Sequence, residues 1–299
     1  MSELATNSVP KDPTINFAIG PNCPVRCDGC YNFFGNTALS GELVTAAEVI
    51  DFAGAAQVEG VTQATLSGGD PLFHPEIVPL AQGLNGLGLK VKLDTVGTAF
   101  LGDARIVYKG KGTAKGVAVA DIAQSVDYVN IPLDGACQTT VANFRRGRSS
   151  LFDETVAVAG LLREAGVSFG FNTVANTSNL DELPAIRDIA EEVGATEWQV
   201  FEYDPNGPNP TTKKPKLKLA PGQFDEATRN LVSTSGNLKV VCKSLATRTG
   251  AYFLVDDSGH AWKPAGEGLR QVFGHITRER DLVMGALGRH ITELQQSAA

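Results

Sequence analysis

The segment TINFAIGPNCPVRCDGC, residues 14–30, decides the architecture of this 299-residue chain. Its first half alternates apolar and polar residues from Thr14 to Gly20, which predicts a β-strand. Its second half is a polar loop with three closely spaced cysteines, Cys23, Cys27 and Cys30. The loop follows the carboxyl end of the strand, the end at which α/β barrels place their active sites.

Strand and helix patterns alternate from this segment onward. Further strands are expected at 63–66, 89–93, 128–132, 168–174 and 198–201, and helices at 45–59, 76–87, 119–124, 151–165 and 181–193. Such alternation favours parallel strands joined by right-handed crossover helices. We therefore predict an α/β fold, a partial (β/α)6 TIM-like barrel of parallel strands. Residues 1–13 form a tail, 14–202 the barrel core, and 203–299 a C-terminal α+β extension that caps the barrel.

The composition excludes several classes of protein. The net charge of −7 and the pI of about 5.2 argue against nucleic-acid binding. No apolar run reaches the roughly 18 residues of a membrane span, and the first residues do not resemble a secretion signal. Five cysteines, three of them within one loop, do not suit a disulfide framework. We expect a cytoplasmic protein.

The spacing Cys23-x3-Cys27-x2-Cys30 indicates an iron–sulfur cluster. A four-iron cluster normally takes four thiolates, so three leave one iron open to a small molecule. An open coordination position is typical of a catalytic metal centre. The alternative is a zinc site with a histidine such as His74 as the fourth ligand, although zinc sites favour two separated Cys pairs.

At this point the sequence resembles the radical S-adenosylmethionine (SAM) superfamily. The matching pieces are CPVRCDGC at 23–30 and SGGDP at 67–71, each directly after a strand. The resemblance implies a partial barrel, one three-cysteine 4Fe–4S cluster, bound SAM, and an electron donor such as flavodoxin or ferredoxin. It also implies a binding segment for the SAM amino group, formed by Gly68, Gly69, Asp70 and Pro71. Glycines let a backbone approach a ligand closely, and Asp70 can accept from an ammonium.

The resemblance extends to three further positions. Asn172 matches the residue that contacts the SAM ribose, and Val200 with Phe201 matches the strand beside the adenine. The family often has an aromatic residue before the third cysteine. This chain has Gly29 there, and Tyr31 after the cysteine is the candidate adenine contact.

Acidic residues follow several of the expected strands. A substrate-binding group is expected from those near the strand ends, Asp94, Asp134, Glu202 and Asp204. Such a group suits the amines of a polyamine or aminosugar. The alternative is that each carboxylate is an ordinary solvent-exposed loop residue at the mouth of the barrel and binds no ligand.

Two cysteines lie outside the cluster loop. A thiol can return a hydrogen atom to a carbon radical, so Cys242 is the candidate donor and Cys137 the alternative. Either can instead be a small buried apolar side chain. Two thiols are too few for a second four-thiolate cluster, which favours a small-molecule substrate. This layout resembles the small epimerases of aminoglycoside antibiotic biosynthesis, such as those that convert neomycin C to B.

Three hypotheses follow. The first is an epimerase that inverts a C–H centre of an aminoglycoside-like sugar. The second is a viperin-like radical dehydratase of a nucleoside triphosphate, supported by the lysines of 109–115 and 213–218. The third is a non-catalytic iron–sulfur or zinc protein with a sensing or scaffold role.

Overall fold

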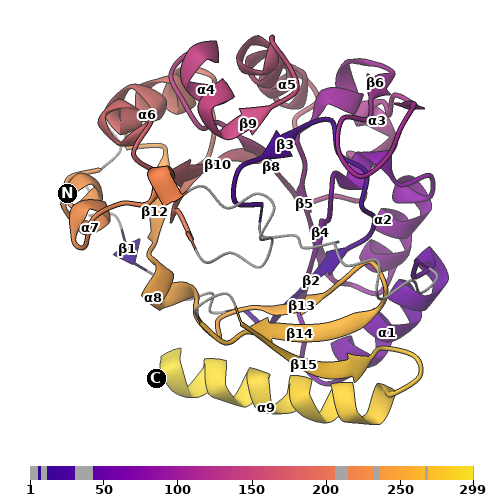
Figure 1. Ribbon diagram of the computed structural model, residues 1–299. Coiled ribbons are helices and arrows are strands. Elements are labelled where there is room, and N and C mark those ends of the chain that lie inside the picture. Colours follow the sequence, from indigo (N-terminus) through magenta and orange to yellow (C-terminus); the bar gives the residue numbers. More distant parts are fainter. Residues whose placement is uncertain are drawn as a thin grey trace.

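The computed structural model describes residues 6–7, 12–30, 43–205, 215–231, 236–266 and 269–298. These residues form one strongly curved sheet of 11 strands, in the order β1-β12-β11-β10-β8-β5-β4-β2-β13-β14-β15. Helices cover its outer surface (Figure 1). Within the described residues the edge strands β1 and β15 do not pair, so the barrel stays open.

The sheet is parallel from β1 to β13 and antiparallel from β13 to β15. Its strands are β1 (Thr6–Asn7), β2 (Thr14–Ala18), β4 (Gln63–Ser67), β5 (Lys90–Asp94), β8 (Tyr128–Pro132), β10 (Phe169–Ala175), β11 (Glu197–Glu202), β12 (Lys239–Lys243), β13 (Phe253–Val255), β14 (His260–Pro264) and β15 (Arg270–His275). Two short pairs lie outside it, β3 (Arg26–Cys27) with β9 (Arg145–Arg146) and β6 (Ala104–Arg105) with β7 (Thr113–Ala114).

The helices of the described residues follow the expected alternation with the strands. The α-helices are α1 (Ala46–Val58), α2 (Ile77–Gly86), α3 (Val119–Ile122), α4 (Gln138–Phe144), α5 (Leu151–Glu164), α6 (Leu183–Glu192), α7 (Gln223–Thr228), α8 (Leu245–Arg248) and α9 (Arg280–Ala298). Four 3₁₀ turns are η2 (Pro71–Phe73), η3 (Thr98–Leu101), η4 (Leu180–Glu182) and η5 (Pro215–Leu217). None of these helices is long and apolar enough to cross a membrane.

Local sequence explains where α1 begins. Thr45 accepts a hydrogen bond from the backbone N–H of Glu48 at 3.2 Å, and the Glu48 carboxylate accepts from the Thr45 N–H at 2.9 Å. This capping box satisfies two backbone donors that the first turn leaves without partners.

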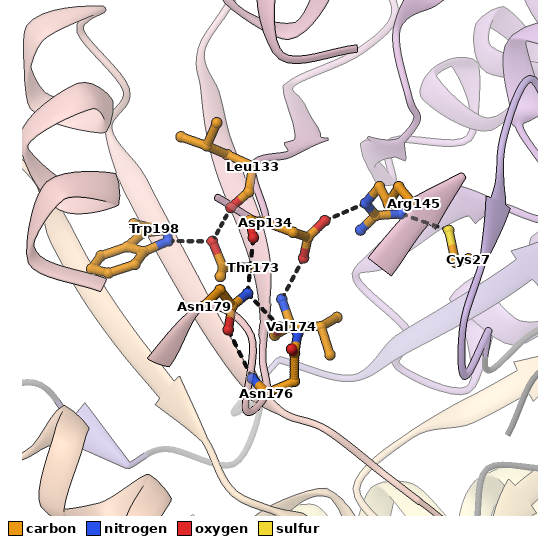
Figure 2. Close-up of polar contacts among 9 residues, drawn as sticks. All are labelled: Cys27, Leu133, Asp134, Arg145, Thr173, Val174, Asn176, Asn179 and Trp198. Carbon is orange, nitrogen blue, oxygen red and sulfur yellow. Dashed lines mark hydrogen bonds and ion pairs between the residues drawn. The ribbon is translucent and has the colours of Figure 1, made fainter. Parts of the chain in front are cut away.

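The core lies between the outer face of the sheet and the helices. Phe52, Phe171 and Trp198 have no measurable exposure there. The Trp198 indole N–H donates to Thr173 Oγ1 at 2.8 Å, and that hydroxyl donates to the Leu133 carbonyl at 2.5 Å (Figure 2). Because buried polar groups need partners, this chain of bonds fixes β10 and β11 against the segment after β8.

The C-terminal third belongs to the same sheet as the core. β12 pairs in parallel with β11 and is a seventh strand of the barrel wall, while β13 pairs in parallel with β2 at the other side. The hairpin β13–β14 turns around 256–259. Residues 203–299 thus extend both sides of the wall, and the expectation of a cap over a six-strand core is corrected accordingly.

Candidate active site

A cavity of about 600 Å³ opens inside the curved sheet, and Cys23, Cys27 and Cys30 all line it. Much of the rest of its wall comes from side chains on the concave face of the strands, which alternate with core residues on the convex face. A cavity of this volume is typical of small-molecule sites. The cysteine loop lies over the carboxyl ends of the parallel strands, as the sequence predicted for an active site.

Three distant segments fix the shape of the cysteine loop. The backbone of Cys23 exchanges hydrogen bonds with Tyr108, at 3.1 and 3.0 Å. Cys27 lies in β3 and pairs with Arg145 in β9. Gly29 has a φ of +88°, and a Cβ there would lie 2.5 Å from the Tyr203 ring. Glycine therefore stands before the third cysteine because Tyr203, itself a cavity-lining aromatic residue, occupies that space.

The donor set fits an iron–sulfur cluster better than a single metal ion. In the described part of the chain, no three His, Cys, Asp or Glu side chains meet closely enough to hold one ion. His74 is not a cavity residue, and its Nδ1 accepts from the Glu76 N–H at 3.1 Å. A cluster takes each thiolate at a different iron, so its ligands surround it rather than meet at a point. The zinc alternative with His74 is therefore not supported.

Burial disfavours free thiolates in the loop. It raises the pKa of Cys23 well above the usual value, with Cys27 and Asp70 adding to the effect. It also raises the pKa of Cys27, although Arg145 opposes that shift. Thiols must lose their protons to bind metal, so cluster binding relieves the burial of these groups.

The glycines after β4 bring two loops together. A Cβ on Gly69 would lie 2.3 Å from the Asn22 carbonyl oxygen, and one on Gly68, whose φ is +141°, would lie 2.8 Å from the Gly20 carbonyl oxygen. Because neither residue has a Cβ, the two backbones approach closely, and the Gly69 N–H donates to the Gly20 carbonyl at 2.7 Å. Both glycines line the cavity. They hold the cysteine loop against the end of β4.

The structure corrects the expected role of Asp70. Its carboxylate accepts from Thr95 Oγ1 at 2.6 Å and from the N–H groups of Val96 and Leu72 at 3.0 and 3.1 Å. Asp70 and Pro71 are buried and do not line the cavity. Burial raises the pKa of Asp70 to about 6. Both carboxylate oxygens of Asp70 accept hydrogen bonds from the loop after β5 or from η2, so they do not face an ammonium group in the cavity.

The other residues expected to contact the cofactor differ in where their side chains point, either into the cavity or into the core. Asn172 and Phe201 line the cavity, and Asn172 Oδ1 is buried without a partner in the described structure. Val200 is fully buried on the convex face, because adjacent strand residues point to opposite sides. The Val200 side chain therefore does not line the cavity, and of this pair only Phe201 does. Tyr31 lies outside the described residues.

Most of the expected acidic group is already engaged. Asp94 lines the cavity and accepts from Asn130 Nδ2 at 2.7 Å. Glu202 lines it as well but accepts from the Leu245 N–H at 2.8 Å. Asp204 also lines the cavity. Asp134 does not: its side chain has no exposure and forms an ion pair with Arg145, so its assignment to the substrate is corrected.

Neither spare cysteine reaches the cavity. Cys242 is 4% exposed and faces the helix layer, where Thr228 of α7 lies beside it. Cys137 is exposed at the N-cap of α4, with its sulfur 3.5 Å from Thr140 Oγ1. All five cysteines lie within the described residues, and only those of the cluster loop line the cavity. Both proposed hydrogen donors are therefore wrong for a substrate in this cavity.

Two positively charged residues near the end of β12 line the cavity and were not predicted from the sequence. Lys243 ends β12 on the concave face, one position after Cys242, and Arg248 follows in α8; both line the cavity. Lys243 Nζ donates to Gln199 Oε1 at 2.5 Å. The alternation of side chains along a strand could have indicated Lys243. A strand that buries Val240 and Cys242 on one face places Lys243 on the other.

Comparison with known proteins agrees with this site. The sequence profile described as the radical SAM superfamily matches residues 17–190. An AdoMet-dependent heme synthase of Methanosarcina barkeri is 30% identical over 204 residues, 68% of this chain and 54% of the relative. A PqqA peptide cyclase of Ruegeria pomeroyi is 30% identical over 60% of this chain and 44% of its own. The chain thus spans about half the length of the curated relatives it matches.

Solved structures share the fold. SuiB of Streptococcus suis bound to the precursor peptide SuiA superposes with a TM-score of 0.68 at 15% identity, over 91% of this chain and 64% of SuiB. The enzyme anSMEcpe with bound AdoMet gives 0.63 at 14% identity, over 95% and 81% of the two chains. The chain therefore belongs to the radical SAM superfamily, whose members use a 4Fe–4S cluster and SAM.

Proposed function

We propose that this enzyme abstracts a hydrogen atom from a substrate that presents a carboxylate to Lys243. The observation that carries the proposal is the cationic wall formed by Lys243 and Arg248 at the carboxyl end of β12. In the described part of the chain, no carboxylate lies within ion-pair distance of either side chain. Half-buried cations that line a cavity and have no direct ion-pair partner favour an anionic ligand.

The surroundings of Lys243 define the proposed subsite. Its ammonium lies 5.0 Å from the ring centroid of Phe201 and 5.8 Å from that of Tyr252. Burial lowers the pKa of Lys243 to about 8, against the opposing effects of Glu197 and Asp94. The side chain therefore stays largely protonated at neutral pH. Arg248 adds a second cation, whose Nε is buried without a partner in the described structure.

This arrangement bears on the aminosugar hypothesis. Of the expected acidic group, Asp134 is paired with Arg145, while Asp94 and Glu202 accept hydrogen bonds from neighbouring groups. A polycationic sugar would also meet Lys243 and Arg248. Epimerisation needs a donor on the opposite face of the substrate, and the two expected thiols lie outside the cavity. We therefore favour an anionic substrate over an aminoglycoside.

The substrate class follows from the charge and from the size of the cavity. The relatives and neighbours are named for heme synthesis, for cyclisation of the PqqA peptide and for binding of the precursor peptide SuiA. A cavity of about 600 Å³ must hold SAM as well as the reacting part of the substrate. We infer a substrate that inserts one carboxylate-bearing group, as a small molecule or as a peptide side chain.

The chemistry divides between cofactors and protein. When bound, the cluster and SAM supply a 5′-deoxyadenosyl radical, with the electron coming from a donor of the flavodoxin or ferredoxin kind. The protein's part is to hold the cysteine loop with Gly68 and Gly69, to offer Asn172 and Phe201 to the cofactor, and to orient the substrate through Lys243. Fixing the reacting carbon relative to the radical is the main contribution available to such a site.

Cleavage of SAM tests the proposal. The reconstituted enzyme is incubated anaerobically with a reductant and with carboxylate-bearing peptides and small acids, aminoglycosides or nucleoside triphosphates, and 5′-deoxyadenosine is measured. Carboxylates should stimulate release, and Lys243→Met should abolish the stimulation while leaving basal cleavage. Lys239→Met, at the exposed start of the same strand, is the matched control. Stimulation by aminoglycosides alone, or an unaffected Lys243→Met variant, would overturn the assignment.

A further inference from the structure

Arg145 connects the cysteine loop to the barrel wall. It stands opposite Cys27 in the β3–β9 pair, and its Nη1 donates to Cys27 Sγ at 3.1 Å. Its side chain is 14% exposed and lines the cavity. A guanidinium stays protonated in proteins, so this is a permanent positive charge beside one of the three loop sulfurs.

A buried carboxylate holds Arg145 in this position. Asp134 accepts from Arg145 Nε and, through its other oxygen, from the Val174 N–H at 2.7 Å. Asn179 Nδ2 then donates to the backbone carbonyls of Asp134 and Val174 at 2.9 and 3.0 Å. Figure 2 shows the resulting line of contacts from β10 through Asp134 and Arg145 to Cys27. The guanidinium is therefore oriented by bonds on both sides.

The neighbouring arginine makes a different set of contacts. Arg146 pairs with Asp28, and its side chain is 43% exposed. In the described structure it makes no contact with a cysteine sulfur, and it does not line the cavity. The two arginines share a strand and a charge but differ in their distance from the loop sulfurs. They therefore form a natural pair for separating an effect at the cluster from a general effect of charge.

We propose that Arg145 is a positioning residue that raises the reduction potential of the cluster, and that Asp134 orients it. Hydrogen bonds to ligand sulfurs and fixed nearby charges are known determinants of such potentials. The change concerned is one electron passed from an external reductant to the cluster, with no atom transferred and no proton lost from Arg145. The added negative charge is stabilised by the guanidinium, which favours the reduced form.

The midpoint potential of the cluster, reconstituted in the whole 299-residue chain, tests this directly. After anaerobic reconstitution and iron analysis, the potential is measured without SAM by a dithionite titration followed by electron paramagnetic resonance. Arg145→Met should shift the reduction equilibrium about tenfold toward the oxidised form, about 59 mV for one electron. Arg146→Met should leave the potential unchanged. Asp134→Asn removes the acceptor that orients Arg145 and should shift the potential in the same direction as Arg145→Met.

Other outcomes overturn the proposal. One is an Arg145→Met protein with full iron content and the wild-type potential. If that variant does not hold iron, the potential is measured in Arg145→Lys and Asp134→Asn instead. Wild-type potentials in both of these variants would refute the proposal. A loss of SAM affinity in Arg145→Met, at an unchanged potential, would make Arg145 a SAM ligand instead. None of these results depends on the substrate, so the proposed function stands or falls separately.

Discussion

The ion pair between Asp134 and Arg145 predicts a large and specific loss of stability when it is broken. The Asp134 side chain has no exposure and that of Arg145 only 14%, so Asp134→Asn leaves a buried guanidinium without its counter-ion. Removing one partner of such a pair costs about 3–5 kcal/mol. The amide oxygen of the new residue can still accept from the Val174 N–H, so the loss reports mainly on the charge.

Asp28→Asn is the matched comparison. Its partner Arg146 is 43% exposed and regains water when the carboxylate is removed. The Asp28 side chain is itself only 5% exposed, but the cation left behind reaches water, so the loss should be close to the value of about 1 kcal/mol or less for exposed pairs. The two substitutions should therefore differ by at least about 2 kcal/mol in the free energy of unfolding, although both remove a carboxylate from an arginine on β9.

Urea unfolding of the apoprotein under reducing conditions measures the difference. The double variant Asp134→Asn/Arg145→Met removes both charges and should lose clearly less than the sum of the single losses, because no unpaired charge remains. Equal losses for Asp134→Asn and Asp28→Asn, or strictly additive losses in the double variant, would refute the reasoning.

Three further predictions concern the cavity and its loop. Gly69→Ala should lower iron content per chain, because its Cβ would lie 2.3 Å from a carbonyl oxygen of the cysteine loop, whereas Gly86→Ala, with open space around it, should not. Cys242→Ser should leave 5′-deoxyadenosine formation unchanged, since this thiol faces α7; a loss of product would restore its candidacy. The KM for a carboxylate substrate should rise as pH increases through about 8, where Lys243 loses its proton beside Asp94, Glu197, Lys239 and Arg248. A Lys243→Met enzyme should show no such dependence between about pH 7 and about pH 9.

Much of the fold could be predicted from local patterns in the sequence. The strand at Tyr128–Pro132 has the predicted bounds, and α1 begins where its capping box indicates. These features depend on residues a few positions apart, such as Thr45 and Glu48. The cysteine spacing likewise predicted a loop that the structure places on the cavity.

Features that depend on distant pairing were not predictable in the same way. Nothing local shows that β12 joins β11, and therefore that Lys243 rather than Cys242 faces the cavity. The two-residue strand containing Arg145 has too little periodicity to be recognised. Asp70 illustrates a different limit: its sequence motif was visible, but its three hydrogen-bond donors come partly from the loop after β5.

The short antiparallel pair of β3 and β9 also has a consequence for how the protein matures. It joins Cys27 to a residue 118 positions later, so the loop is not held in place until β8 and α4 have been synthesised and folded. Contacts of such long sequence separation form late, because the entropy of closing the intervening chain must first be overcome. Iron–sulfur assembly proteins should therefore meet a preformed cysteine loop only after the first half of the barrel is complete, and iron loading should report on that stage of folding.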